Sequence, residues 1–239
     1  RRRSGGGRGA RTPTSACGTR WDESARSADS SRSASVLLRI RCAARPANER
    51  KLHDPPTPNT TPALIGTLTL TATADGAALT GCWFENDRFY NGPRTAEMER
   101  DDDAPALAQA RAWLDRYFAG ERPDPLELPL APQGSDFRQR VWKILLEIPY
   151  GETMTYGDIA HRLAAQSGGK MSAQAVGGAV GHNPIGVIIP CHRVMGAKGN
   201  LTGFGGGIAT KIKLLEHEKT DMEGFYVQEG DGRCRRRRL

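Results

Sequence analysis

The hydrophobic pattern changes its period along the chain. In Thr67-Leu68-Thr69-Leu70-Thr71-Ala72 apolar and polar positions alternate, and after Asp75-Gly76 an extended run resumes from Leu79 to Phe84. Alternation with period two around a turn dipeptide predicts a β-hairpin. Apolar residues then recur at helical spacing from Leu107 to Phe118, with Gly120 as a stop. We therefore expect a small α+β domain over residues 64–131.

From residue 132 to 226 helical patterns dominate. Three helix starts carry capping residues: Ser135, Thr155 with Asp158 three residues later, and Ser172. A last amphipathic helix follows Gly207, with Ile208, Ile212 and Leu215 on one face. The second and third helices are short and joined by the Gly168-Gly169 turn, which indicates a helix-turn-helix or an ordinary helical hairpin. The third helix is built almost entirely of small residues, which favours close approach to a narrow groove over reading of bases by side chains.

Composition separates the two ends from the rest of the chain. Residues 1–63 are rich in Arg, Ser, Gly and Pro, and residues 227–239 include the run Arg235-Arg236-Arg237-Arg238. Such segments bury too little apolar surface to offset chain entropy, so we expect both to be disordered. The formal charge of +7 comes from these ends. Residues 133–219 are also basic, by +4, so a polyanionic partner is expected on this second region.

The five cysteines show no Cys-x-x-Cys spacing. This pattern favours neither a disulfide framework nor a zinc site. No apolar run approaches 18 residues and no signal-peptide pattern is present. We expect a cytoplasmic monomer that binds no metal, cofactor or membrane.

One cysteine stands in a chemically suggestive context. Cys191 lies in Pro190-Cys191-His192-Arg193-Val194, directly behind the apolar run Val187-Ile188-Ile189, which we expect to be a short buried strand. The thiolate is the reactive form of cysteine, so a nucleophilic thiol needs a base, and His192 is the nearest candidate. Glu218, at the margin of the last helix's apolar face, needs a partner and can orient His192. The alternative is that Cys191 is a buried structural cysteine.

These segments together resemble the O6-alkylguanine-DNA alkyltransferases, the methylated-DNA-protein-cysteine methyltransferases. The likeness runs from about Asp136 to Glu218 and is weaker over residues 64–131. Its motifs are Phe137-Arg138-Gln139-Arg140-Val141-Trp142, Ile148-Pro149-Tyr150-Gly151, Thr155-Tyr156-Gly157, Ala175-Val176-Gly177, Asn183-Pro184, Pro190-Cys191-His192-Arg193-Val194 and Leu214-Leu215-Glu216-His217-Glu218. In this order and spacing they are highly specific.

The resemblance implies an α+β protein. Its N-terminal domain would be a small ribonuclease H-like α/β unit containing the hairpin, and its C-terminal domain a mostly helical, winged helix-turn-helix-like unit carrying the reactive cysteine. It also implies DNA repair without a cofactor: double-stranded alkylated DNA is bound, the damaged base is flipped out, and the alkyl group of O6-alkylguanine, or of O4-alkylthymine, is transferred once and irreversibly to Cys191.

Residue roles follow from the same resemblance. The implied catalytic residues are Cys191, His192 acting through a water, Glu218, Asn183 as a brace and Tyr156 as a proton donor toward N3 of guanine. The implied substrate-binding residues are Val194, Phe204, Gly205 and Arg193, and the implied DNA-binding residues are Ser172, Ala173, Gln174, Ala175 and Gly177. Each has a plain structural alternative, such as a core aromatic for Tyr156 or a turn residue for Asn183.

One departure from the family pattern concerns the third helix. Better-known members insert an arginine into the duplex where this chain has Gln174, so we expect a weaker electrostatic hold on DNA. Two other functions stay open from the residues alone: a lesion-binding module without chemistry, and a cysteine hydrolase. Adjacent Cys and His side chains point apart in an extended segment, which favours a bridging water or a bend.

Overall fold

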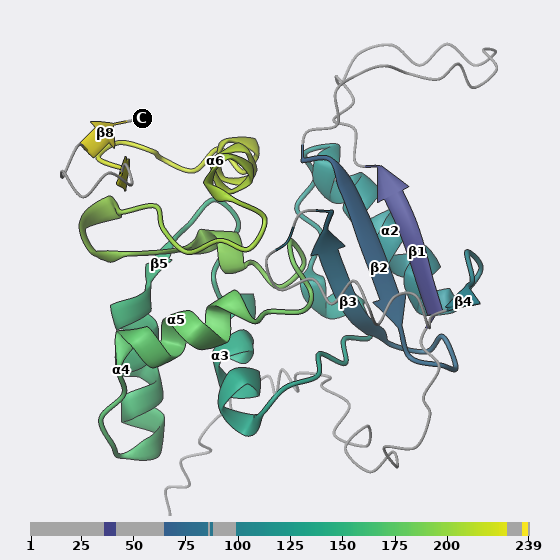
Figure 1. Ribbon diagram of the computed structural model, residues 1–239, viewed down its shortest axis with the longest axis horizontal. Coiled ribbons are helices and arrows are strands. Elements are labelled where there is room, and N and C mark those ends of the chain that lie inside the picture. The colour runs from purple at the N-terminus through teal and green to yellow at the C-terminus, as the bar shows by residue number, and fades with distance from the viewer. Residues whose placement is uncertain (1–35, 42–64, 86, 88–98, 229–235, 239) are drawn as a thin grey trace, which may run out of the picture.

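A computed structural model describes residues 36–41, 65–85, 87, 99–228 and 236–238. It contains a sheet-bearing N-terminal domain and a helical C-terminal domain, seen as two lobes in Figure 1. Together they form the α+β arrangement expected from the sequence. Within the described ranges, every helix is too short or too polar to span a membrane.

The N-terminal domain is a four-stranded sheet with one long helix. Its elements are β1 (Val36–Arg41), β2 (Thr67–Ala72), β3 (Leu79–Phe84), β4 (Glu99–Arg100), α2 (Pro105–Phe118) and η2 (Pro125–Glu127). The strand order is β3-β2-β1-β4, with β1 antiparallel to β2 and parallel to β4. The predicted hairpin is confirmed by the antiparallel pairing of β2 with β3. Helix α2 lies across one face of the sheet and buries Leu107, Leu114 and Tyr117 (Figure 1).

Strand β1 corrects the expectation that residues 1–63 are disordered. Residues 36–41 pair along their whole length with β2 and occupy an interior position in the sheet. The sequence Val36-Leu37-Leu38-Arg39-Ile40-Arg41 is a good strand former, but it is only six residues long and its apolar character is diluted by the Arg- and Ser-rich flanks. Residues 236–238 of the expected C-terminal tail likewise pair as β8 with β7. The remainder of both ends, 1–35, 42–63, 229–235 and 239, lies outside the described residues.

The C-terminal domain is mostly helical. Its elements are α3 (Asp136–Leu146), β5 (Met154–Thr155), α4 (Tyr156–Ser167), α5 (Ala173–Gly181), η3 (Cys191–Arg193), β6 (Val194–Met195), η4 (Ala197–Gly199), α6 (Ile208–His217), β7 (Tyr226–Gln228) and β8 (Arg236–Arg238). The predicted caps are confirmed: the side chains of Ser135, Thr155 and Ser172 accept hydrogen bonds from the first turns of α3, α4 and α5. Helix α4 ends at Ser167 and is capped by Gly168 in the left-handed conformation, which lets α5 turn back against α4 (Figure 1).

Short backbone connections place the nucleophile segment between the two domains. The amide of Cys82 in β3 donates to the carbonyl of Pro184, and the amide of Gly186 donates to the carbonyl of Cys82, both at 2.8 Å. On the other side, β6 pairs in parallel with β5, matching Met154 with Val194. Because β5 leads directly into α4, this pairing brings the start of α4 next to the residues that follow Cys191.

Candidate active site

The segment that precedes Cys191 is buried but is not a strand. Val187, Ile188 and Ile189 are at most 1% exposed. Their backbone forms tight turns, with Ile188 N donating to Gly186 O at 2.8 Å and Ile189 N donating to Ile185 O at 3.0 Å. The strand expected over 187–189 is therefore wrong, although its burial is confirmed. A short apolar run shows burial but does not distinguish a strand from a buried turn.

Asn183 takes over the hydrogen bonding that a sheet would have supplied to this turn. Its Nδ2 donates to the carbonyl of Ile189 at 2.8 Å, and its Oδ1 accepts from the amide of Ile185 at 3.1 Å. Buried backbone groups without partners are costly, so one amide side chain that satisfies two of them stabilises the turn. The Asn183 side chain thus holds the turn at Ile189, two residues before Cys191.

Cys191 begins a single 3-10 turn over Cys191–Arg193, so the chain bends here rather than running extended. Cys191 is 8% exposed and lines a small hollow. Burial raises the pKa of Cys191 to about 11, and a hydrogen bond with Asn183 acts in the opposite direction. The thiol is therefore protonated at neutral pH in the free protein, and a nucleophilic role requires a base.

His192 has the arrangement that such a base needs. The ring is fully buried, and its Nε2 lies 2.8 Å from Glu218 Oε1. Burial lowers the pKa of His192, although the adjacent carboxylate opposes this shift. A neutral ring with its hydrogen on Nε2 donates to Glu218 and keeps a lone pair on Nδ1. Within the described part of the chain, Nδ1 has no hydrogen-bond partner.

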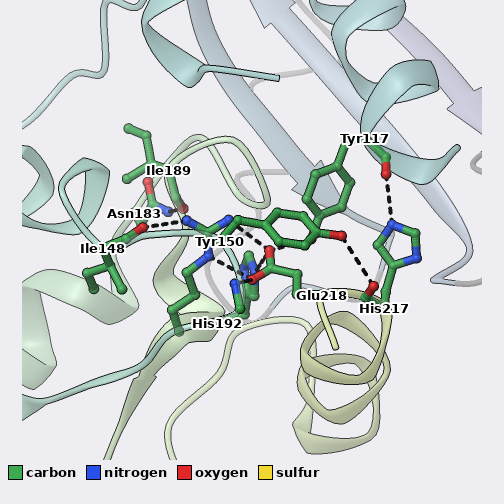
Figure 2. Close-up of polar contacts among 10 residues, drawn as sticks. Tyr117, Ile148, Tyr150, Asn183, Ile189, His192, His217 and Glu218 are labelled. Atoms are coloured by element: carbon green, nitrogen blue, oxygen red, sulfur yellow. Dashed lines mark hydrogen bonds and ion pairs between the residues drawn. The ribbon is translucent and has the colours of Figure 1, made fainter. Parts of the chain in front are cut away.

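Glu218 is the most heavily hydrogen-bonded side chain of the site and is only 1% exposed. Figure 2 shows its carboxylate at the centre of a network of polar contacts. Besides His192, it accepts hydrogen bonds from Arg193 Nε at 2.8 Å, Tyr117 Oη at 2.7 Å and the amide of Gly151 at 3.2 Å. Burial acts to raise the pKa of Glu218, but the bonds from His192 and Arg193 outweigh it and hold the pKa well below its ordinary value.

The Arg193 side chain pairs with Glu218 and does not line the hollow beside Cys191. Its guanidinium donates through Nε and Nη2 to the two oxygens of Glu218, at 2.8 and 2.9 Å, and through Nη1 to the carbonyl of Ile148 at 2.6 Å. These bonds hold the side chain in the interior, at 7% exposure. The contacts of the side chain form a buried ion pair, and substrate binding by Arg193 stays a prediction. The sequence could not show this, because Arg193 and Glu218 are 25 residues apart.

The other expected pocket residues gather around Cys191. Phe204 and Gly205 line the same hollow as the sulfur, and Val194 follows the 3-10 turn. Tyr156 begins α4, and its hydroxyl lies 3.3 Å from the carbonyls of both Thr202 and Gly203. Burial raises the pKa of Tyr156 to about 12, which keeps its proton available for donation.

Two further residues act at the site without an obvious sequence signal. Tyr117 comes from the N-terminal domain, which showed no catalytic feature in the sequence, yet its hydroxyl donates to Glu218. Lys211 on α6 is fully buried, and its Nζ donates to the carbonyls of Val194 and Thr202. Burial lowers the pKa of Lys211 to about 8, and this cation in turn lowers the pKa of Cys191. The sequence signal for Lys211 was its position: a lysine stands at a core position of the α6 pattern, one turn before Leu215.

The residues expected to contact DNA lie together at the start of α5. Ser172, Ala173, Gln174 and Ala175 are exposed, and Gly177 is half-buried beside the ring of Tyr156. The opposite side of α5 is anchored by Trp142, whose Nε1 donates to the carbonyl of Ala179 at 2.9 Å. The helix thus presents an exposed surface of mostly small side chains, with Gly177 next to the Tyr156 ring.

Comparison with known proteins agrees with this arrangement. Residues 60–132 match the ribonuclease-like domain of 6-O-methylguanine DNA methyltransferase, and residues 136–220 match its DNA-binding domain. A methylated-DNA–protein-cysteine methyltransferase of Haemophilus influenzae is 39% identical over 169 residues, which are 71% of this chain and 87% of that protein. One of Mycobacterium bovis is 53% identical over 118 residues, covering 49% and 68% of the two chains.

Solved structures give the same result. The crystal structure of Mycobacterium tuberculosis OGT in complex with DNA is 46% identical, with a TM-score of 0.55, and covers 65% of this chain and 88% of that one. A variant of the M. tuberculosis O6-methylguanine methyltransferase, R37L, matches over 79% of this chain with 40% identity and a TM-score of 0.56. With its two domains both matched, the chain belongs to the 6-O-methylguanine DNA methyltransferase family.

Proposed function

We propose that this protein repairs O6-alkylguanine in double-stranded DNA by transferring the alkyl group once, and irreversibly, to Cys191. The observation that carries the proposal is the array at the 3-10 turn: a buried thiol followed by a neutral imidazole that is held by a carboxylate. A thiol whose pKa is raised needs deprotonation, and the lone pair on His192 Nδ1 can supply it.

In the proposed step, the thiol proton passes through a water to His192 Nδ1, and Glu218 stabilises the imidazolium. The sulfur then forms a bond to the alkyl carbon while the bond from that carbon to guanine O6 breaks. The electron pair stays on guanine, where Tyr156 donates toward N3 and the purine finally gains one proton. The products are a thioether on Cys191 and an unmodified guanine, so no cofactor is consumed.

Base flipping is proposed because the hollow beside Cys191 lies inside the protein, where a base stacked in a duplex does not reach. Helix α5 is the element that supports this role. Its exposed small residues permit close approach to the DNA, and the Tyr156 ring packs beside Gly177 of the same helix. O4-alkylthymine as a second substrate and a monomeric state remain predictions of the sequence.

Mass spectrometry of the intact protein tests the proposal. Incubation with an O6-methylguanine duplex is expected to add one methyl group per molecule, mapped to Cys191. Cys191→Ser should give no adduct, whereas Cys82→Ser, which changes a second buried cysteine of the described residues, should leave the transfer intact. Multiple turnovers would instead support a hydrolase, and tight lesion binding without an adduct would support a binding module.

The DNA-binding part of the proposal has its own test at Gln174. Gln174→Arg adds a fixed charge to the exposed start of α5, so duplex affinity should rise and the slope of log affinity against log salt should steepen by about 0.9. Gln174→Ala is the matched control and should leave the slope unchanged. Equal affinity and equal slope for the wild-type protein and Gln174→Arg would contradict this role.

A further inference from the structure

The N-terminal domain contributes a carboxylate to the pocket that holds the nucleophile. Asp87 follows the end of β3, where its amide donates to the carbonyl of Phe84 at 3.1 Å. Asp87 and Phe84 line the same hollow as Cys191, together with Phe204 and Gly205 of the loop before α6. The room left in this hollow is about 10 Å³, enough for roughly one water molecule and far less than a purine needs.

The carboxylate lies directly over Gly205. A methyl group built on the Cα of Gly205 would fall 2.5 Å from Asp87 Oδ1 and 2.9 Å from Oδ2, closer than atoms of this kind can approach. Glycine at position 205 therefore makes room for the Asp87 side chain. Gly205 is also one of the residues proposed to contact the alkylated base, so Asp87 is placed beside the incoming substrate.

Two charges of opposite sign act on Cys191. Lys211 lies under the Val194 and Thr202 carbonyls and lowers the pKa of Cys191, whereas the Asp87 charge raises it, although less than burial does. The remaining walls include the apolar side chains of Phe84, Val180 and Phe204. The rings of Phe84 and Phe204 meet edge to face, with their centroids 5.4 Å apart.

We propose that Asp87 is a specificity-determining residue that selects the O6 substituent by its charge. The pocket accepts neutral alkyl groups, for which its aromatic walls are suited, and rejects anionic ones such as carboxymethyl, because like charges repel strongly in a space with little water. This inference rests on the proposed function, since it names the substituents that the Cys191 site accepts.

The chemical step is the same for both kinds of substituent. The sulfur bonds to the methylene carbon of the carboxymethyl group, the bond from that carbon to O6 breaks, and guanine retains the electron pair. Only the carboxylate attached to the reacting carbon differs from a methyl substrate. The two substrates also differ in size and in intrinsic reactivity, but these differences are the same for every variant. A change in the ratio of the two rates between variants therefore reports the electrostatics of the pocket.

The experiment compares two duplexes that carry O6-methylguanine or O6-carboxymethylguanine at the same position, with excess protein and mapping of the adduct on Cys191. The measured quantity is the ratio of the methyl rate to the carboxymethyl rate. Replacing Asp87 by asparagine, Asp87→Asn, keeps the shape and removes the charge, so this ratio should fall roughly tenfold or more. Asp115→Asn, an exposed acid on α2, is the matched control and should keep the wild-type ratio.

A second variant keeps the test decisive if Asp87→Asn does not fold. Gly205→Ala places a methyl group where the Asp87 carboxylate lies and displaces it, so the ratio should fall in this variant as well. An unchanged ratio in both Asp87→Asn and Gly205→Ala would overturn the selection by charge while leaving the methyl transfer in place. Absence of a methyl adduct in the wild-type protein would overturn the proposed function and this inference together.

Discussion

The two ends of the array formed by Cys191, His192 and Glu218 are built differently. At the Glu218 end both carboxylate oxygens accept hydrogen bonds, from His192, Arg193, Tyr117 and the amide of Gly151 (Figure 2). At the Cys191 end the sulfur lies in a small hollow, and in the described part of the chain His192 Nδ1 has no partner. The hydrogen bonds of the Glu218 end are complete, so we call it the saturated end. The Cys191 end keeps an unused hydrogen-bond acceptor, His192 Nδ1, where the substrate has to react.

This difference assigns the two ends separate tasks. A fully satisfied buried network holds the imidazole in one tautomer and one orientation. A buried thiol with a raised pKa stays protonated, and therefore unreactive, until a substrate and a proton path are in place. We therefore expect changes at the Glu218 end to lower stability strongly, and changes at the Cys191 end to alter transfer with little effect on stability.

The largest expected effect comes from removing the cation that neutralises Glu218. Arg193→Met leaves a buried carboxylate without its bidentate partner and should lower the free energy of unfolding by about 3–5 kcal/mol. Urea denaturation at pH 7 measures this loss. Arg162→Met, which breaks the exposed pair with Glu147, is the control and should cost about 1 kcal/mol or less. Equal losses of stability in the two variants would contradict the strong dependence of stability on the Glu218 end.

The second-largest expected effect is a loss of stability in acid, caused by protonation of Glu218. The folded state holds the pKa of Glu218 below its ordinary value of 4.5, so the stabilisation is fully present above that pH and is lost as the pH falls toward the folded-state pKa. Urea midpoints measured from pH 7 down to pH 3 should therefore fall more steeply in the wild-type protein than in Glu218→Gln. Glu223→Gln, at an exposed position, should follow the wild-type curve. Parallel curves for wild type and Glu218→Gln would contradict the assignment.

Tyr117→Phe tests the contribution of the N-terminal domain to the same carboxylate. The change removes one hydrogen bond to a charged group and should cost about 1.5–3 kcal/mol of stability. The rate of methyl transfer should fall less than in Arg193→Met, because His192 keeps its bond to Glu218. Tyr150→Phe, whose hydroxyl donates to the carbonyl of His217 instead, is the matched control, with an expected cost of about 0.5–1.5 kcal/mol.

At the Cys191 end we expect the opposite balance. Lys211→Met keeps a similar volume but removes the cation near the sulfur, so methyl transfer should slow several-fold. The loss of stability should stay below that of Arg193→Met. The two carbonyls lose a hydrogen-bond donor, but removal of the buried ammonium, which is costly as its pKa of about 8 indicates, offsets part of this loss. Lys213→Met, exposed on the same helix, should change neither property. A large loss of stability without slower transfer would place Lys211 with the saturated end.

Local sequence signals were reliable wherever a short stretch of chain carries the whole physical reason. The hairpin of β2 and β3, the caps at Ser135, Thr155 and Ser172, and the apolar face of α6 were all predicted correctly. The pairing of His192 with Glu218 was also predicted and is confirmed. By contrast, strand β1 was missed because the residues on both sides of it are rich in Arg and Ser. Residues 187–189 were predicted to form a strand but form tight turns.

The sequence by itself determined that Cys191 is buried, that His192 adjoins it and that a carboxylate on the last helix needs a partner, because burial and capping follow from neighbouring residues. Only the tertiary structure decided what surrounds them. It directs Arg193 inward to Glu218 and brings Tyr117 and Asp87 from the other domain to the site. These contacts join residues 25 to more than 100 positions apart, and their energies depend on desolvation and charge, which exist only after the domains have packed together.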